Sequence, residues 1–410
     1  MGAVVFSRSA QIKIYTFLLV LYYILTMLYP NNDNPGEQLA ERIYPQIIMG
    51  ILGLFSLYLT LKNANSLIKS TLCKPFLLYL ILSFIYIFFP ITNKTIYDNF
   101  IYFLKLDMAI LTIGCLYSFL KVNRELTLKC IYIIYFVQLF YGLESLIVDR
   151  LGSLSEQNEI FNSNAGFSLI STLPMTLLLP IKRLRIYLYL LVVAACLASG
   201  QRSAALAAII SIPFSYRDIR DGIRKNDKVL ITILLAIALV PIATFAYMNI
   251  MLRNAIDAEK GDIGSGRSVF WLLLIIDFFD KNVFHMIFGN GYFSTQALLK
   301  IKYGMGIEAH NGWLQNLYVF GFIGFIFYAR TVFIMYKQNK FYNKIQNGVK
   351  NILLICFIIF FVKSSTSHGN WDISVMPFSL VIAMVADQIR IIKRASKSND
   401  SNKNQSCITA

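Results

Sequence analysis

Apolar runs of about twenty residues, separated by short polar breaks, recur along the chain from Thr16 to Met384, and each is long enough to cross a bilayer as a helix. The breaks predict about twelve helices. They lie at roughly 12–29, 43–61, 75–91, 100–119, 128–147, 165–180, 186–199, 203–216, 229–248, 312–335, 350–364 and 373–389. We therefore predict an all-α integral membrane protein with about twelve transmembrane helices.

The composition indicates the same class. Of the 410 residues, 57% are hydrophobic and 15% are charged, whereas soluble domains average about a quarter charged residues. No small-residue cleavage site follows the first run, Tyr15 to Tyr29, so we expect a retained helix. We expect residues 1–396 to form one polytopic transmembrane domain. Residues 397–410 contain no apolar run and are predicted to be a polar, disordered cytoplasmic tail.

The formal charge of +16 would suggest a nucleic-acid partner in a soluble protein. Here most Lys and Arg residues gather in short loops between the apolar runs, as the positive-inside rule predicts when both termini are cytoplasmic. We therefore expect no nucleic-acid partner. The six cysteines are scattered and form no CxxC pair, which argues against a disulfide framework or a zinc site.

One outer segment differs from the other loops. Residues 249–311, between the ninth and tenth predicted helices, are too many for a simple connection. Within this long periplasmic loop, the stretch from Val269 to Phe279 has an apolar helical pattern that predicts a helix at the membrane interface.

Two arginines in polar breaks suggest an anion site. Arg202 lies among small residues, Ser203 included, that permit close approach of a helix or a ligand. Arg267 follows the glycine-rich Gly264-Ser265-Gly, where a starting helix would point its N–H groups at an anion. Each guanidinium can bind a phosphate or diphosphate as a planar fork. The alternatives are a snorkelling arginine and an ordinary loop arginine.

His310 is the candidate proton acceptor. It precedes Asn311 and Gly312 at the start of the tenth predicted helix, where an imidazole can take a proton near neutral pH. Glu308 can orient this imidazole or carry the proton itself. The alternative is an asparagine-capped helix start with an incidental histidine. His368 falls in the last outer loop, where a structural and a functional role fit equally well.

The other polar features give less evidence of a functional site. Lys105 and Asp107 share a predicted helix at spacing i, i+2, so they point to different faces and need separate partners. The outer loops hold no Asp-x-Asp motif, and the histidines show no i, i+4 pair, so we expect no metal and no cofactor. The turn Gly289-Asn-Gly-Tyr-Phe293 is predicted only to bend the chain.

Four of these pieces together give a family resemblance. They are Ser199-Gly-Gln-Arg-Ser203, Ser265-Gly-Arg-Ser-x-x-Trp271, Gly289-Asn-Gly-Tyr-Phe293, and His310-Asn-Gly-Trp-Leu-Gln315 running into Gly321-Phe-Ile-Gly324. With these four motifs in this order, the chain resembles the O-antigen polymerase and O-antigen ligase superfamily of bacterial envelope enzymes. The resemblance covers about residues 165–335, and the first five predicted helices match only in character.

The resemblance implies a metal-independent glycosyltransferase that uses undecaprenyl-diphosphate-linked glycans. It implies that Arg202 and Arg267 hold the donor diphosphate and that His310 activates the acceptor hydroxyl, with inversion at the donor's anomeric carbon. We expect further substrate contacts around these three catalytic residues. The expected substrate-binding residues are Glu308, Asn311, His368, Ser265 and Ser203.

The expected function is therefore that of an O-antigen polymerase in the bacterial inner membrane, with the active site facing the periplasm and a chain-length regulator protein as a partner. The 265–271 and 289–293 pieces favour a polymerase over a ligase that transfers the glycan to lipid A-core. A polysaccharide transporter or flippase is the less favoured alternative, because transporters of this size usually show two similar halves.

Overall fold

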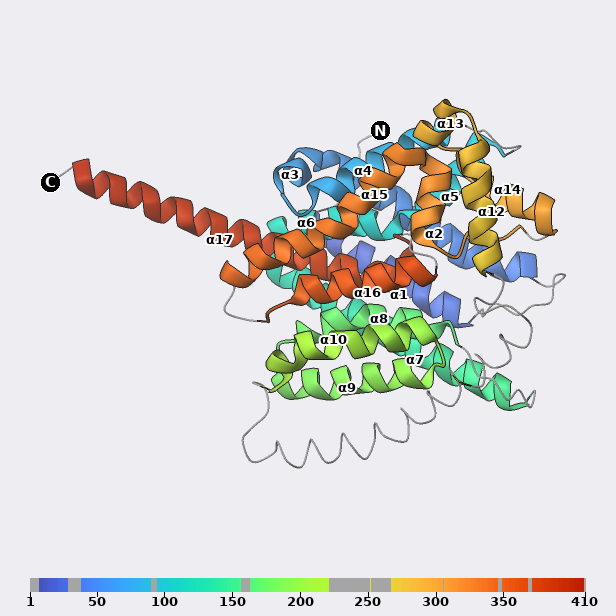
Figure 1. Cartoon of the computed structure of the whole chain (residues 1–410). Helices are drawn as coiled ribbons and strands as arrows, with labels where there is room; N and C mark the ends of the chain where they lie inside the picture. Colours follow the sequence, from blue (N-terminus) through green and yellow to red (C-terminus); the bar gives the residue numbers. More distant parts are fainter. Residues whose placement is uncertain are drawn as a thin grey trace.

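The computed structural model describes residues 7–28, 38–89, 94–155, 163–220, 251, 267–304, 306–345, 349–367 and 371–408 (Figure 1). Across these residues it is 87% helical and contains no strand, which confirms the all-α class. The helices are α1 (Arg8–Leu28), α2 (Gln38–Lys62), α3 (Ala64–Lys69), α4 (Lys74–Ile85), η1 (Tyr86–Phe88), α5 (Ile96–Leu106), α6 (Met108–Val122), α7 (Arg124–Ser155), α8 (Ala165–Leu177), α9 (Lys182–Ala198), α10 (Arg202–Arg220), α12 (Arg267–Asp280), α13 (Val283–Phe288), α14 (Ser294–Tyr303), α15 (Gly312–Ile345), α16 (Ile352–Thr366), η2 (Ile373–Val375) and α17 (Met376–Ile408).

Among the described residues, five helices are long and apolar enough to cross a membrane, and a sixth span is formed if α5 and α6 count as one. The five are Arg8–Leu28, Tyr44–Lys62, Arg124–Ser153, Gly312–Lys344 and Ile373–Ser396. Three shorter apolar helices accompany them, Lys74–Phe88, Ala165–Leu177 and Ile352–Thr366. The predicted helix 229–248 lies outside the described residues, so the count of about twelve spans stays a prediction.

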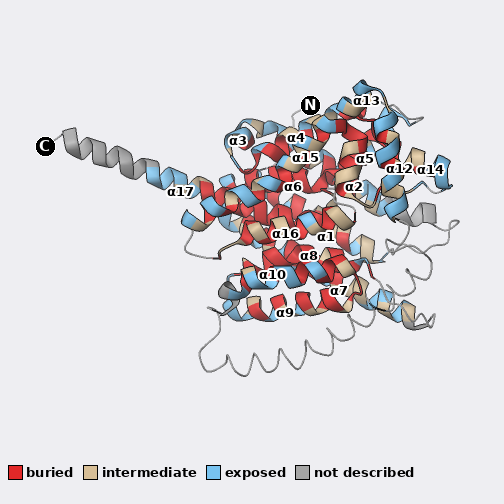
Figure 2. Cartoon of the chain, in the orientation of Figure 1, coloured by how far each residue is buried: buried red, intermediate tan, exposed pale blue. Residues whose placement is uncertain are grey.

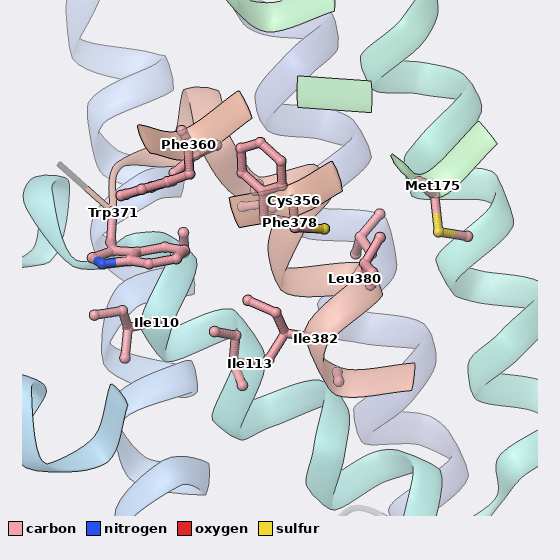
Figure 3. Packing of buried hydrophobic residues seen from close by; sticks show 14 of the residues in the cluster. Ile110, Ile113, Met175, Cys356, Phe360, Trp371, Phe378, Leu380 and Ile382 are labelled. Carbon is pink, nitrogen blue, oxygen red and sulfur yellow. The ribbon is translucent and has the colours of Figure 1, made fainter. Parts of the chain in front are cut away.

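Most buried apolar side chains form one large core that includes residues of α1, α4, α6, α8, α16 and α17 (Figure 2). A second, small cluster joins α12 to α15 and consists of Leu274, Phe278, Ala309 and Tyr318. Trp371 is buried in the large core and stacks on Phe360, with ring centroids 4.1 Å apart (Figure 3). Its indole N–H donates to the Thr331 hydroxyl at 3.0 Å, and its carbonyl accepts the backbone N–H of Ala109 at 2.8 Å. Trp371 therefore ties three helices together, α15 and α16 through its side chain and α6 through its backbone carbonyl.

The predicted single helix 100–119 is instead two helices, α5 and α6, which meet at Asp107 with a bend of 62°. The Asp107 side chain is buried and accepts a hydrogen bond from the Ser83 hydroxyl. The Ser83 hydroxyl lies 2.6 Å from the Tyr292 hydroxyl. A buried carboxyl group needs such partners, so the break in this helix depends on contacts with α4 and with the 289–293 turn. Lys105 is exposed whereas Asp107 is buried, but the two residues do not share one helix as predicted, because α5 ends at Leu106.

The 289–293 turn was predicted only to bend the chain, and that description is incomplete. Gly289 and Gly321 have positive φ angles of 78° and 65° and lie backbone against backbone. A methyl group on Gly289 would lie 2.3 Å from the Val319 carbonyl oxygen, and one on Gly321 would lie 2.4 Å from the Gly289 nitrogen. Only glycine fits both positions, because it lacks a side chain and tolerates positive φ.

This contact breaks α15 at Gly321, and Figure 1 shows the two arms at a sharp angle. A break removes intrahelical partners from the carbonyl groups of the preceding turn. The turn replaces them, since the backbone N–H groups of Asn290 and Gly291 donate to the carbonyls of Tyr318 at 3.0 Å and of Val319 at 2.9 Å. The segment that causes the break in α15 therefore also supplies hydrogen-bond donors to the carbonyl groups that the break exposes.

The C-terminal stretch differs from its prediction. It was expected to be disordered, but α17 continues through it to Ile408 and projects away from the helical body in Figure 1. No glycine or proline interrupts the chain after Pro377. A polar composition is compatible with a solvated helix as well as with a disordered coil, so composition alone did not distinguish them.

The glycine contact predicts an unequal response to the same substitution at two glycines. Gly289→Ala should destabilise the protein by about 3 kcal/mol or more, because the methyl group adds an overlap with α15 to the strain of the left-handed backbone. Gly304→Ala is the matched control, since Gly304 also has a positive φ of 73° but faces open space. Thermal unfolding of the detergent-solubilised variants measures the difference. Equal melting temperatures would contradict this role of the contact.

Candidate functional site

The three predicted catalytic residues belong to three different parts of the helical body. Arg202 is the first residue of α10, Arg267 is the first described residue of α12, and His310 comes two residues before α15 begins at Gly312. Figure 1 shows the lower end of α12 and the right-hand ends of α10 and α16 in one region. The N-terminus of α10 carries partial positive charge, which together with the two guanidinium groups favours an anion.

The start of α15 is attached to the C-terminal turn of α16 through Asn311. Its side-chain oxygen accepts the backbone N–H groups of Trp313 at 3.0 Å and of Leu314 at 3.1 Å, which is the role of a helix N-cap. Its side-chain N–H group donates to the Ser365 carbonyl at 3.2 Å, and the Trp313 indole donates to the Ser365 hydroxyl at 3.2 Å. The asparagine cap of the alternative interpretation is therefore present, and the same residue also positions the neighbouring histidine.

His310 has a left-handed backbone, with φ of 49°. This conformation is unfavourable for most residues and persists only where the surroundings enforce it. The preceding Ala309 is fully buried, its N–H group donates to the Gln315 side chain at 3.1 Å, and its carbonyl accepts from the Trp271 indole at 2.9 Å. These bonds on one side, and those of Asn311 on the other, hold the chain around the half-buried histidine.

Arg267 contacts the same turn of α16. Its guanidinium donates to the Thr366 carbonyl at 2.8 Å, next in sequence to the Ser365 carbonyl that binds Asn311. Arg267 and the His310 loop are thus attached to consecutive carbonyl groups. The indole of Trp271, one turn along α12, also binds the His310 loop. The remaining N–H groups of a half-buried guanidinium can bind a ligand.

Arg202 approaches from the other side of α16, against which α10 packs. Gly200, with φ of 68°, makes the turn from α9 into α10, and the Gln201 amide donates to the Asn164 side chain at 3.0 Å. Burial and the positive charge of Arg202 lower the pKa of Arg267. The two guanidinium groups are therefore within electrostatic range, and an anion between them would relieve their repulsion.

The small residues around Arg202 serve helix packing, one of the two uses predicted for them. A methyl group on Gly166 of α8 would lie 2.4 Å from the Ser199 hydroxyl oxygen, so the turn before Arg202 lies directly on α8. Ser203, the second residue of α10, is 8% exposed. Its substrate-binding role stays a prediction.

Glu308 binds a residue that was not predicted from the sequence. Its carboxylate accepts a hydrogen bond from the Tyr102 hydroxyl at 2.6 Å, and the same hydroxyl accepts from the Gln296 amide at 3.0 Å. Tyr102 also lines an open cavity of about 610 Å³ between α1, α2 and α5. Lys105, which had no assigned partner, lines this cavity too. Tyr102 thus connects the cavity to the loop that carries His310.

Lys363 is a further cation close to the site. It lies one turn before Thr366 in α16, is 4% exposed, and donates to the Ser374 hydroxyl at 2.6 Å. The Ser374 hydroxyl in turn donates to the Asp372 carboxylate. A buried ammonium group needs such compensation. A lysine within an apolar run was the sequence signal for this residue, but its partners lie across a loop and could not be identified from spacing.

The structure leaves part of the predicted site untested. His368 and Ser265 lie outside the described residues. Across the part of the chain that is described, no three His, Cys, Asp or Glu side chains group as a metal site would require. The substrate-binding roles and the metal-independent reaction stay predictions.

Comparisons with models of protein families, with curated proteins and with solved structures each found no match to this chain. The membrane-protein class rests on the apolar helices. The family resemblance rests on the four sequence motifs alone.

Proposed function

We propose that this chain is an O-antigen or surface-polysaccharide polymerase, a membrane glycosyltransferase that joins undecaprenyl-diphosphate-linked oligosaccharide repeat units. The observation that carries the proposal is the gathering of Arg202, Arg267 and the His310 loop around one end of α16. In the proposed setting, this end faces the periplasm from the bacterial inner membrane. A chain-length regulator protein is the proposed partner.

The two arginines suit a diphosphate leaving group. Departure of undecaprenyl diphosphate leaves negative charge on the phosphate oxygens, and fixed guanidinium groups can offset it without reorganisation. Arg202 begins α10, so the N-terminus of this helix adds partial positive charge. The undecaprenyl chain would lie along exposed apolar side chains of α12, such as Leu272 and Ile276.

The cavity beside Tyr102 suits the acceptor glycan. Its lining includes the aromatic rings of Tyr97, Tyr102 and Phe293, together with Lys94 and Lys105. Aromatic rings can pack on the apolar faces of sugars, while the polar groups fix orientation. Because Tyr102 binds Glu308, an acceptor in this cavity would direct a hydroxyl toward the His310 loop.

The proposed reaction is a single displacement. The acceptor hydroxyl oxygen attacks the anomeric carbon of the donor, and the bond from that carbon to the diphosphate oxygen breaks. The bonding electrons leave with undecaprenyl diphosphate, and the hydroxyl proton passes to the His310 imidazole. Glu308, two residues away, can accept this proton in turn or orient the imidazole.

The lipopolysaccharide pattern of a deletion strain tests the function. Loss of the O-antigen ladder with retention of core carrying a single repeat is expected for a polymerase. Loss of all O-antigen, with lipid-linked chains accumulating, would show a ligase instead. Purified protein that joins lipid-linked repeat units in detergent would exclude a transporter, and failure to join them under any acceptor condition would overturn the enzyme proposal.

His310→Asn should abolish transfer while the protein remains folded in the membrane. Asparagine tolerates the left-handed backbone of this position, so the variant removes the base without adding strain. His285→Asn is the matched control and should retain activity, because the His285 ring contacts Asn282 and Phe284, its neighbours at the start of α13. The measurement is sugar transfer by purified protein. Wild-type transfer by His310→Asn would defeat the assignment of the base.

Arg267→Lys should lower the transfer rate by about tenfold or more, because lysine cannot hold the Thr366 carbonyl and a phosphate with one planar fork. Arg330→Lys makes the same chemical change in the distant part of α15 and should leave the rate unchanged. Steady-state kinetics with a lipid-linked donor measures both variants. If Arg267→Lys kept full activity, a single positive charge would be sufficient, and the proposal that the planar guanidinium of Arg267 binds the diphosphate would be wrong.

A further inference from the structure

A second polar cavity lies at the opposite end of the helical body from the candidate site. It has a volume of about 490 Å³ and lies between α3, the end of α6 and α17. α6 and α17 both start beside Trp371, where the Ser379 hydroxyl donates to the Ala109 carbonyl at 2.7 Å. From Met376 to Arg390, α17 rises roughly 20 Å, so the cavity and the candidate site lie at separate ends. In Figure 1, α3 lies at the left and α12 at the right.

Five cations line this cavity. They are Lys69, Lys121, Arg390, Lys393 and Arg394. No carboxylate stands among the described residues that line it. Cations that only follow the positive-inside rule need no common cavity. Here they come from three separate segments of the chain and converge on one concave surface, which is the arrangement of a binding site rather than of a solvated loop.

The carboxylate that is bonded to the lining residue Arg390 is shared with a second arginine. Asp387 is 1% exposed and binds two arginines, Arg390 through its Oδ1 atom and Arg124 through its Oδ2 atom at 3.1 Å. The ammonium group of Lys121 donates to the Ser66 hydroxyl at 2.8 Å and lies within electrostatic range of Arg394. A neutral hydroxyl does not offset its charge. The cluster therefore retains excess positive charge that a multivalent anion would neutralise.

The surroundings match a phosphate group that carries lipid chains. Ser70 and Thr71 line the cavity and supply hydroxyl groups. Next to the lining cations in sequence are exposed apolar side chains, namely Ile68 at 43% and Val122 at 43% exposure. A soluble anion gains nothing from such neighbours, whereas acyl chains would cover them. Basic pockets between transmembrane helices are known to suit anionic lipid head groups.

We propose that this cavity binds a phosphate-bearing anion, with the head group of an anionic phospholipid as the favoured source. The site is independent of the transfer reaction proposed above, because it lies at the other end of α6 and α17 and shares no lining residue with the candidate site. By the distribution of basic residues, this end is the cytoplasmic one, so the lipid would come from the inner leaflet.

The test compares two triple variants with equal loss of charge. Lys69→Gln/Lys121→Gln/Arg394→Gln removes cations of the cavity, and leaves Arg390 in place because its loss would disturb Asp387. Lys62→Gln/Lys182→Gln/Arg183→Gln removes exposed cations elsewhere. Each protein is placed in phosphatidylcholine nanodiscs with or without cardiolipin, and native mass spectrometry measures cardiolipin retention. In a separate arm, inorganic tripolyphosphate is titrated onto the proteins in neutral nanodiscs.

We expect the cavity variant to bind cardiolipin at least about tenfold more weakly than wild type, while the control binds it normally. Cavity-dependent binding of tripolyphosphate, with cardiolipin retention equal in all three proteins, would support the site with a soluble source. Equal weakening in both triple variants, or no binding of either probe by wild type, would overturn the proposal. Equal melting temperatures in neutral nanodiscs serve as the folding control.

Discussion

The backbone contact between Gly289 and Gly321 determines where the first arm of α15 can lie. An unbroken helix would continue in a straight line through Gly321, so its first turns could not change direction at this point. The contact releases the arm that begins at Gly312, and the 289–293 turn satisfies the carbonyl groups that the break exposes. In a bilayer an unsatisfied carbonyl costs several kcal/mol, so the break and the turn can exist only together.

From this break follows the arrangement of the candidate site. The released arm brings Asn311 to the Ser365 carbonyl, while Arg267 occupies the neighbouring carbonyl of Thr366. The C-terminal turn of α16 thus serves as a shared acceptor for α12 and α15, and α10 adds Arg202 from the other side. The buried ammonium group of Lys363 lies one turn further down, compensated through Ser374. The polar groups are held mainly by backbone carbonyls, which leaves part of their hydrogen-bonding capacity for a ligand.

Local signals predicted the parts of this arrangement that depend on neighbours in sequence. The apolar runs predicted the helices, and Asn311 before Gly312 indicated where α15 begins. The break at Gly321 was not predicted, because its cause lies in Gly289, far earlier in the chain. Tyr102 was missed for the same reason, since its partner Glu308 is remote in sequence. The bend at Asp107 depends on Ser83, another tertiary contact. The periodicity of apolar residues reports the secondary structure that a segment prefers by itself. The break at Gly321, the Tyr102–Glu308 contact and the bend at Asp107 depend on contacts between segments that are distant in sequence.

The shortness of α8 and α16 has a consequence for the surrounding lipid. At 1.5 Å per residue their 13 and 15 residues reach only ~20 Å and ~22 Å, whereas the hydrocarbon core of a bilayer is ~30 Å thick. Both helices are packed among other helices of the core, so water rather than lipid would fill the depth above their ends. Because Arg202, Arg267 and His310 lie at those ends, they would occupy a hydrated depression below the general level of the membrane surface. A polyprenyl-linked head group could then reach them without its lipid tail leaving the acyl layer.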